Sequence, residues 1–418
     1  MKHKSEVLVI GGGVVGICSA YYLTEQGRKV TVVDKGEVCS GSSYGNAGLV
    51  VPSHCVPLAE PGVLTKGLQW MFDPESPFYI KPRFDPEMFK WLWKFRGACS
   101  GRHVRRAMPI IRDLHFASLQ LYEELATLDD LEFGFEKRGM LMAFKSEKGF
   151  KEGIEEANLM QRIGLEIKIL NGGEIQELEP NARTDITGGV FYPQDVHLIP
   201  AKFVQGLAQH IERKGAEIHT DTEVLGFETS GNQVAVVKTT RGDFVADEVV
   251  LASGSWSPGI ADDLQIKLPI QPAKGYSVTV KRPEKCPVIP FNLAEAKVAV
   301  TPMGDMLRFA GTLELAGLDL SINRRRVDAI LGAVPDYLPE LKPEQLELIE
   351  IWRGLRPCTP DGLPFLGRLN RYENLIVAAG HAMIGLSLGP ITGKLVSQVV
   401  THEKPSIDLT MLNVGRFS

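Results

Sequence analysis

Short apolar runs separated by glycine and polar segments open the chain. Residues 7–10 form an apolar run that leads into Gly11, and residues 30–33 form a second, mostly apolar run that ends at Asp34. The order indicated is strand, glycine turn, helix, strand and terminal carboxylate. Short continuous apolar runs of this kind are typical of buried parallel strands.

Later stretches repeat the pattern of a buried strand that feeds a turn or a helix. An amphipathic helix at about 200–214 precedes a strand at 216–220, a second strand spans 242–252, and a third at 375–379 leads to a helix at about 390–401. Parallel strands that feed glycine turns and helices predict an α/β sheet. Because long insertions separate these strands, we expect the sheet to be assembled from three chain segments.

The glycines of the first turn have separate physical roles in a dinucleotide site. Gly11 permits a tight turn, Gly13 lets the backbone approach a pyrophosphate, and Gly16 lets the helix pack close to the strand. The helix N-terminus then presents its N–H groups and its dipole to phosphate, and Asp34 accepts hydrogen bonds from ribose hydroxyls. The spacing predicts a site for an adenine dinucleotide. The alternative is a glycine turn required only for packing.

The insertions differ in character from the predicted sheet. The first is rich in helix formers, and the second contains alternating strand-like runs such as residues 276–280. We expect them to form an α+β substrate domain, an antiparallel sheet with helices, that caps a Rossmann-like domain. The predicted Rossmann-like domain comprises residues 1–50, 200–266 and 351–418, and the predicted substrate domain comprises residues 51–199 and 267–350.

Composition excludes several classes of protein. The formal charge of −5 over 418 residues gives no reason to expect a nucleic-acid partner. No stretch approaches the roughly 20 apolar residues needed to span a bilayer. Glu6 and the glycines after residue 10 interrupt the apolar N-terminal segment, so we expect a buried first strand and no signal peptide, with the mature chain starting here.

The six cysteines are widely scattered along the chain. They show neither the paired short spacing of a zinc site nor a dense disulfide framework, so no metal site is predicted. This use of cysteine is typical of the reducing cytoplasm, and we expect a cytoplasmic location.

An aromatic segment followed by basic residues has two interpretations. It forms either a patch that rests peripherally on the inner face of an anionic membrane, beside a quinone or another electron acceptor, or the core of a helical hairpin with a solvated charged face. Its members are Trp70, Phe72, Phe78, Tyr79, Trp91, Trp93 and Phe95, followed by Lys94, Arg96, Arg102, Arg105 and Arg106.

Four further motifs, in order along the chain, resemble one known family. They are GSSYGNAG at 41–48, AKGYS at 273–277, RFAGTLE at 308–314 and GLRPCTPDGLP at 354–364. Together with the N-terminal unit they resemble the D-amino-acid dehydrogenase branch of the D-amino-acid oxidase-like, FAD-dependent amine oxidoreductases. That branch also contains glycine oxidase and D-proline or D-hydroxyproline dehydrogenases. The resemblance spans nearly the whole chain.

The resemblance implies FAD as the cofactor and assigns residues to it. A C-terminal turn, matched here by residues 380–389, lies against the flavin ring in this family. A helix N-terminus at that position stabilises negative charge on a reduced flavin. The implied cofactor residues are Gly11, Gly13, Val14, Val15, Gly16, Asp34, Lys35, Ser42, Ser43, Asn46, Ala47, Gly48, Val224, Ser253, Gly254, Gly385, Leu386 and Ser387. The resemblance also implies a dissociable FAD, so we expect Cys55 to be a small buried hydrophobe and not a covalent tether.

In this family the Cα hydride of an amino acid moves to flavin N5, and the imino acid formed is released and hydrolysed. Positioning and electrostatics are expected to carry most of this reaction. Arg356 matches the family position that binds the substrate carboxylate, a task suited to a guanidinium fork. The alternative for Arg356 is a structural salt bridge.

Three weaker candidates accompany Arg356. Arg308 is a second candidate for the carboxylate, although a strand arginine is commonly a surface charge. The phenol of Tyr276 donates to the same carboxylate or lies in the core. His381 contacts the substrate, tunes the flavin or is a satisfied structural histidine.

One departure from glycine oxidases concerns the C-terminal turn, where Met383 stands in a stretch that carries an arginine in those enzymes. A deformable apolar wall favours a larger or cyclic D-amino acid such as D-proline, D-hydroxyproline or D-alanine. The electron acceptor is a quinone, an electron-transfer partner or O₂. The alternative functions are therefore an oxidase that produces H₂O₂ and a flavin subunit of a larger complex. A cation near the flavin promotes reaction with O₂, and Lys274 is a candidate that does not by itself decide between these functions. A dinucleotide-binding regulator without catalysis is disfavoured by the full set of motifs.

Overall fold

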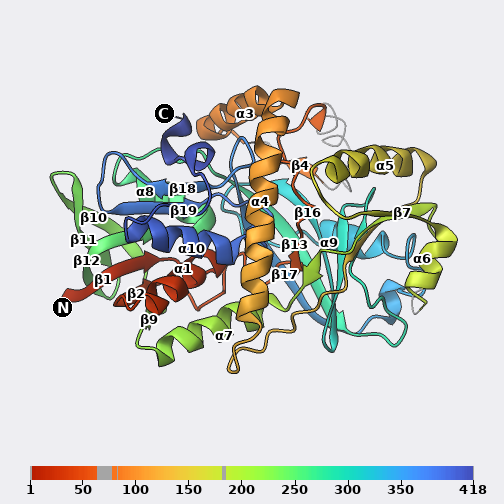
Figure 1. Cartoon of the computed structure of the whole chain (residues 1–418), viewed down its shortest axis with the longest axis horizontal. Coiled ribbons are helices and arrows are strands. Elements are labelled where there is room, and N and C mark those ends of the chain that lie inside the picture. The colour runs from red at the N-terminus through yellow and green to blue at the C-terminus, as the bar shows by residue number, and fades with distance from the viewer. Residues whose placement is uncertain (1, 64–77, 82, 181–184, 418) are drawn as a thin grey trace.

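Two large β-sheets, with helices packed on them, dominate the computed structural model, which describes residues 2–63, 78–81, 83–180 and 185–417. Helix α4 (Gly101–Leu125) crosses the molecule between the half that holds the first sheet and the half that holds the second (Figure 1). Both ends of the chain lie on the side of the first sheet.

The first sheet is built around parallel strands. Strand β1 (Lys2–Ile10) lies between β2 (Val30–Val33) and β12 (Gly242–Leu251) and pairs in parallel with both. Strand β9 (Glu217–His219) lies beside β2. On the edge of β12 opposite β1, β11 (Gln233–Thr239) pairs with the first residues of β12 and is followed by β10 (Val224–Ser230), and β19 (Leu375–Ala379) pairs with the last residues of β12 and is followed by β18 (Phe365–Arg368). Strands β9, β2, β1, β12 and β19 run parallel and come from three chain segments, which confirms the predicted α/β class.

Three helices pack against the first sheet. They are α1 (Val14–Glu25), α7 (Pro200–Arg213) and α10 (Gly389–Val400). Helices α1 and α10 lie so close that a Cβ at Gly393 would meet the backbone carbon of Cys18 at 2.4 Å. This close packing brings the N-terminal end of α10 beside the N-terminal end of α1, because a Cβ at Gly389 would lie 2.7 Å from the side chain of Val14.

The second sheet is mostly antiparallel, as predicted. In order across the sheet its strands are β17 (Leu348–Cys358), β13 (Gln271–Lys281), β16 (Met306–Leu315), β15 (Val298–Met303), β14 (Phe291–Leu293), β5 (Met140–Phe144), β7 (Gly188–Tyr192) and β6 (Lys168–Asn171), and β4 (Phe78–Ile80) pairs with β16. A short ladder of β3 (Leu49–Val50) with β8 (Val196–His197) is separate from both sheets.

The remaining helical elements surround these sheets. They are α3 (Pro86–Ala98), α5 (Glu147–Arg162), α6 (Gly172–Leu178), α8 (Ser257–Asp262) and α9 (Arg324–Gly332), with 3₁₀ turns at Gly254–Trp256, Pro343–Gln345, Thr410–Leu412 and Val414–Phe417. Helix α3 begins cleanly because Asp85 caps it, its carboxylate accepting from the N–H groups of Glu87 and Met88.

Two features differ from the predicted division of the chain. The boundary predicted at residue 351 falls inside β17, which pairs with β13 of the second sheet from Leu348 to Cys358. Helix α4, predicted to belong to the substrate domain, packs on α10 and places Leu114 and Leu121 in the same core as Val9 of β1. The sequence pattern could not show either feature, because both depend on how distant segments pair.

Candidate active site

The glycine turn before α1 forms a bare backbone cradle. Gly11 has φ +118°, and a Cβ there would lie 2.6 Å from the carbonyl oxygen of Ala252. A Cβ at Gly16 would lie 1.8 Å from the carbonyl oxygen of Gly11. Only glycine fits at either position, so the backbone passes unobstructed in front of the N-terminus of α1. Gly13 caps this helix without a side chain, which leaves room for an anion there.

Asp34 lies at the end of β2 beside this cradle. Its carboxylate accepts hydrogen bonds from the N–H groups of Gly12 at 2.6 Å and of Gly36 at 2.9 Å. Burial raises the pKa of Asp34, and these two N–H donors oppose that rise. The segment that leads to Val224 passes the same point, because the N–H of Thr222 donates to the carbonyl of Asp34 at 2.7 Å.

Two more predicted cofactor positions flank the turn. The hydroxyl of Ser253 donates to the carbonyl of Ile10 at 3.0 Å, so the end of β12, with Gly254 after it, lies beside Gly11. The ammonium of Lys35 lies 4.0 Å from the ring centroid of Trp256.

The loop of residues 41–48 connects the cradle to the second sheet. The hydroxyl of Ser43 accepts from the N–H of Val14 at 3.0 Å, at the first residue of α1. The hydroxyl of Ser42 donates to the carbonyl of Leu355 on β17 at 2.5 Å. The Asn46 side chain accepts from the N–H of Gly48 and shapes the end of the loop, with Ala47 between them. The loop therefore lies between α1 and β17.

The C-terminal turn reaches the same place through α4. The hydroxyl of Tyr122 donates to the carbonyl of Leu386 at 2.6 Å, and Nδ1 of His115 lies 2.7 Å from the hydroxyl oxygen of Ser387. The N–H of Val51 also donates to that oxygen at 3.0 Å. Gly385 precedes this anchored pair. Two side chains of α4 thus fix the turn that the sequence predicts to lie against the flavin.

Arg356 lies on the face of the second sheet that meets loop 41–48. Its Nη1 donates to the carbonyl of Thr312 at 2.7 Å, and its guanidinium fills the space left by Gly275 on the neighbouring strand. Burial lowers the pKa of Arg356. Within the described residues it makes no ion pair with a carboxylate, so the salt-bridge alternative finds no partner there. An incompletely compensated guanidinium of this kind is suited to an anionic ligand.

Trp352 lies on the same face as Arg356, two residues earlier on β17. A Cβ at Gly45 would lie 2.0 Å from the indole of Trp352, and a Cβ at Gly354 would lie 1.8 Å from it. The indole therefore lies directly against loop 41–48. Trp352 is not among the residues predicted from the sequence, although the alternation of Trp352, Gly354 and Arg356 along one strand was the available signal.

Arg308 is buried and serves the loop. Its Nη1 donates to the carbonyls of Tyr44 at 3.0 Å and of Asn46 at 2.9 Å, and its Nε donates to the hydroxyl of Thr279 at 3.0 Å. It is 5% exposed, so it is not the surface charge of the alternative interpretation. Because Arg308 makes these bonds inside the protein, its geometry suits a role in positioning loop 41–48. It suits a role in holding a substrate carboxylate less well.

Tyr276 points away from Arg356. The pairing of β13 with β17 places Arg356 opposite Ala273 and Tyr276 opposite Arg353, so the two side chains lie on opposite faces of the sheet. The phenol donates to the carboxylate of Glu314 at 3.0 Å and is 1% exposed. This position matches the core alternative, and a direct bond to the substrate carboxylate finds no support in the geometry. Lys274 lies on the same far face, so it is not a cation beside loop 41–48.

His381 follows β19 and is also buried. Its Nε2 lies 3.0 Å from the hydroxyl oxygen of Thr392 in the first turn of α10. Burial lowers its pKa to about 4, so the imidazole is neutral at physiological pH. These contacts match the satisfied structural histidine among the three interpretations. Cys55 is fully buried, and burial raises its pKa to about 12, which suits the expected buried hydrophobe.

These parts converge into one site from four distant segments. The cradle before α1 and Asp34 suit the pyrophosphate and ribose of a dinucleotide, and loop 41–48 with the turn at 385–387 leads from there to the face of Arg356. A group with phosphates at one end and a reactive ring at the other fits this sequence of contacts. The individual FAD contacts named from the sequence stay predictions.

A sequence profile of the FAD dependent oxidoreductase family matches residues 6–399. The chain belongs to this family. Similar curated proteins include a D-amino acid dehydrogenase of Chromohalobacter salexigens, 34% identical with 99% of this chain and 100% of the relative covered. Another is a D-amino acid dehydrogenase of Granulibacter bethesdensis, 31% identical with 99% of each chain covered. The predicted family and the predicted dependence on FAD are therefore confirmed.

Solved structures show the same fold. Glycine oxidase from Geobacillus kaustophilus matches with a TM-score of 0.81 at 24% identity, with 100% of each chain covered. L-proline dehydrogenase from P. horikoshii matches with a TM-score of 0.76 at 21% identity, with 100% of this chain and 98% of that chain covered. These likenesses support the two-sheet architecture of an FAD-dependent oxidoreductase.

The described residues contain no second centre of another kind. Within the described ranges, no cluster of three His, Cys, Asp or Glu side chains has the arrangement of a metal site. No helix in those ranges combines the length and apolarity needed to cross a membrane. All six cysteines are free thiols.

Proposed function

We propose that this FAD-dependent oxidoreductase dehydrogenates a D-amino acid to the corresponding imino acid. The observation that carries this proposal is Arg356, a guanidinium beside the flavin loop with one hydrogen bond to the protein and no carboxylate partner among the described residues. An amino-acid carboxylate supplies the missing counter-charge and binds in two-point geometry. The relatives named D-amino acid dehydrogenase support the stereochemistry.

The chain's own residues hold the substrate and shape its surroundings. Arg356 fixes the carboxylate, and Met383 in the C-terminal turn offers an apolar wall for the side chain. Trp352 and loop 41–48 limit the space on the flavin side. The substrate loses a hydride from Cα and a proton from its amine, and water then hydrolyses an acyclic imino acid to a keto acid and ammonia. Bound FAD supplies the electron-accepting ring.

We favour a dehydrogenase that passes electrons to a quinone or a protein partner over an oxidase that uses O₂. Lys274, one candidate for a cation that promotes reaction with O₂, lies on the far face of β13 and pairs with acids there. A preference of the substrate-reduced enzyme for an artificial quinone over O₂ supports this choice. Equal or faster turnover with O₂, with stoichiometric H₂O₂, contradicts it.

Helix α3 supplies a candidate surface for a membrane-bound acceptor. Phe89 and Trp93, one helical turn apart, are 55% and 74% exposed, and Phe84 before the helix is 92% exposed. The guanidinium of exposed Arg96 lies 5.9 Å from the ring centroid of Trp93, and exposed Arg102 and Arg105 follow at the start of α4. Apolar rings beside cations suit an anionic bilayer surface. Trp91 and Phe95 instead stack in the core, while Trp70 and Phe72 lie outside the described residues.

Sedimentation with vesicles tests this surface. We expect binding to vesicles that contain anionic lipid, and weaker binding by the double variant Phe89→Ser, Trp93→Ser. The variant Trp91→Phe, which changes a buried ring of the same helix, is the control for helix α3 itself. Equal binding of wild type and the double variant to anionic vesicles contradicts the surface assignment.

Anaerobic mixing of the yellow holoenzyme with D- and L-amino acids tests the reaction itself. We expect D-proline, D-hydroxyproline or D-alanine to bleach the visible absorbance of the oxidised flavin, and their L-forms to leave it unchanged. Bleaching by glycine, sarcosine or an L-imino acid, with none by any D-amino acid, would keep the fold and overturn the substrate class.

A further inference from the structure

Strand β16, which carries the hydrogen-bond partner of Arg356, does not pair regularly with β13. Lys274 of β13 pairs with Glu314 of β16, but Tyr276, two residues on, pairs with Gly311. Three steps along β16 therefore match two steps along β13, which leaves a bulge at Thr312. Bulges bend a strand and re-aim its groups, and they are frequent beside active sites.

Thr312 has a backbone conformation that β-branched residues rarely adopt. Its φ is +59°, in the left-handed region. Its hydroxyl is buried without a hydrogen-bond partner among the described residues, so the side chain does not explain the conformation. In this conformation its carbonyl accepts the 2.7 Å hydrogen bond from Nη1 of Arg356. Strained residues persist where the surrounding structure holds them in place.

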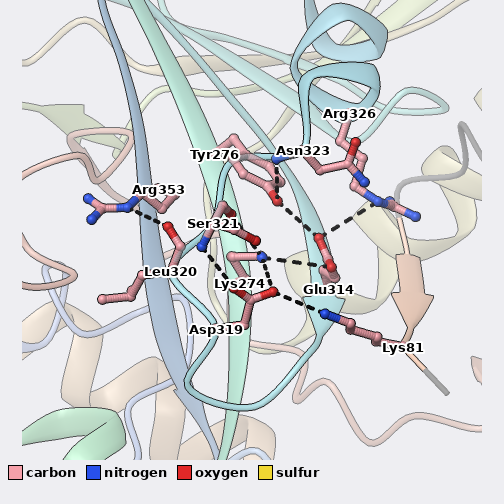
Figure 2. A network of polar contacts seen from close by, with 10 residues as sticks. All are labelled: Lys81, Lys274, Tyr276, Glu314, Asp319, Leu320, Ser321, Asn323, Arg326 and Arg353. Atoms are coloured by element: carbon pink, nitrogen blue, oxygen red, sulfur yellow. Dashed lines mark hydrogen bonds and ion pairs between the residues drawn. The ribbon is translucent and has the colours of Figure 1, made fainter. Parts of the chain in front are cut away.

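The far face of the sheet holds the end of this bulge. Two residues after Thr312, the buried carboxylate of Glu314 accepts from the phenol of Tyr276 at 3.0 Å. The ammonium of Lys274 and Nε of Arg326 each lie 3.8 Å from the same carboxylate. Figure 2 shows these side chains pointing from β13 and α9 toward Glu314 on β16.

A second acid, Asp319, connects the loop that follows β16 to Lys274, which also contacts Glu314. Asp319 pairs with Lys274 at 3.2 Å and with Lys81 at 3.3 Å, and it accepts from the N–H of Ser321 at 2.9 Å. The pKa of Asp319 lies well below its usual range, mainly because its carboxylate accepts from the N–H of Ser321 and also because it pairs with Lys274. This carboxylate is therefore charged. The N–H of Asn323 donates to the phenol of Tyr276 at 3.3 Å, which closes the network (Figure 2).

We propose that Tyr276 and Glu314 are positioning residues for substrate binding: from the far face of the sheet they fix the Thr312 bulge, and the bulge holds Arg356 in the orientation that receives the carboxylate. The inference rests on the proposed function, because it takes Arg356 as the carboxylate site. One edge of the guanidinium is fixed by the Thr312 carbonyl, and its other donors are left for the ligand. Loosening Glu314 releases this orientation without removing any group that contacts the substrate.

Binding of propionate to the holoenzyme tests the proposal. Propionate has the carbon skeleton and carboxylate of alanine without the amine, and its binding beside the flavin is followed as a change in the visible spectrum. We expect Tyr276→Phe and Glu314→Gln each to raise the Kd for propionate about tenfold, the scale of a weakened charge-assisted hydrogen bond. The limiting rate of flavin reduction by saturating D-alanine should stay within about twofold, because the groups that meet the reacting atoms are unchanged.

Tyr337→Phe is the matched control. Tyr337 is also buried and donates to a glutamate, Glu295, at 2.7 Å, but this pair has no contact with the bulge. It should leave the Kd for propionate unchanged. Equal loss in Tyr337→Phe would mark the effect as general loosening of the second sheet and overturn the proposal.

Two further outcomes distinguish failure of the positioning network from failure of the carboxylate site. Wild-type propionate binding in both Tyr276→Phe and Glu314→Gln, with binding lost in Arg356→Leu, overturns the positioning network and keeps the carboxylate site. Unchanged binding in Arg356→Leu removes the carboxylate site and the network proposal together. If Glu314→Gln fails to fold, the loss of one oxygen atom in Tyr276→Phe decides.

Discussion

The guanidinium of Arg356 occupies the space that any side chain at position 275 would need. A Cβ at Gly275 would lie 2.1 Å from Nη1 of Arg356. We expect Gly275→Ala to push the guanidinium aside and to raise the apparent Kd for D-alanine in anaerobic flavin reduction by about tenfold or more. Gly97→Ala in helix α3, where a Cβ meets nothing within 4 Å, is the control. Wild-type affinity in Gly275→Ala would show that the guanidinium does not act from this position.

Arg308 should affect the cofactor more than the substrate. It holds the carbonyls of Tyr44 and Asn46, and hydrogen bonds from a charged donor contribute about 1.5–3 kcal/mol. We expect Arg308→Leu to raise the Kd of the apoprotein for FAD by about tenfold or more. Arg371→Leu, which removes an exposed arginine that donates to Gln265, should leave it unchanged. A variant with normal FAD affinity and weakened substrate binding would restore Arg308 as a carboxylate ligand.

Gly16 tests the cradle directly. A Cβ there would lie 1.8 Å from the carbonyl oxygen of Gly11, so alanine must separate α1 from β1. We expect Gly16→Ala to purify with little or no bound FAD and with a lower Tm than wild type. The flavin-to-protein absorbance ratio measures the first effect. A fully yellow, stable variant would contradict the close approach of helix and strand.

His381 gives a prediction about pH. Burial lowers the pKa of His381 to about 4 in the folded protein, whereas its pKa in the unfolded chain is about 6.5. The stability that the neutral imidazole contributes is therefore fully present above about pH 6.5. It falls by about 1.4 kcal/mol per pH unit as the pH is lowered from about 6.5 to about 4, the folded pKa. We expect His381→Asn to lose less Tm than wild type between pH 7 and pH 5. Its kcat/KM profile above pH 5 should keep the wild-type shape, and a lost inflection near neutral pH would show that His381 titrates during turnover.

The sequence predicted the elements that rest on local pattern. Apolar runs and turn residues that are contiguous in the chain predict the strand and glycine turn before α1 and the position of Asp34. They also predict strands β12 and β19. The glycine cradle could be predicted because its glycines lie within six residues of one another in the chain. Assembly of the first sheet from three segments followed from the same pattern.

The face that each strand residue occupies could not be predicted. Tyr276 and Arg356 come from neighbouring strands, and only the register of β13 against β17 shows that they point to opposite faces. The role of Arg308 depends on the arrival of loop 41–48 above it. The contacts of His115 and Tyr122 with the C-terminal turn join residues more than 260 positions apart, and no local signal marks them.

The most direct test of the account compares two arginines on one strand. Arg356 faces the flavin loop, and Arg353 faces the opposite side, where its Nε donates to the carbonyl of Leu320. In anaerobic reduction of the bound FAD by D-alanine, we expect Arg356→Leu to retain FAD but to raise the half-saturating concentration about 100-fold or more, the scale of losing a buried charge pair. Arg353→Leu should change it less than about threefold, because it removes a half-buried group that lies on the opposite face from the substrate carboxylate. Half-saturation of Arg356→Leu at the wild-type concentration would contradict the assignment of the substrate carboxylate to Arg356.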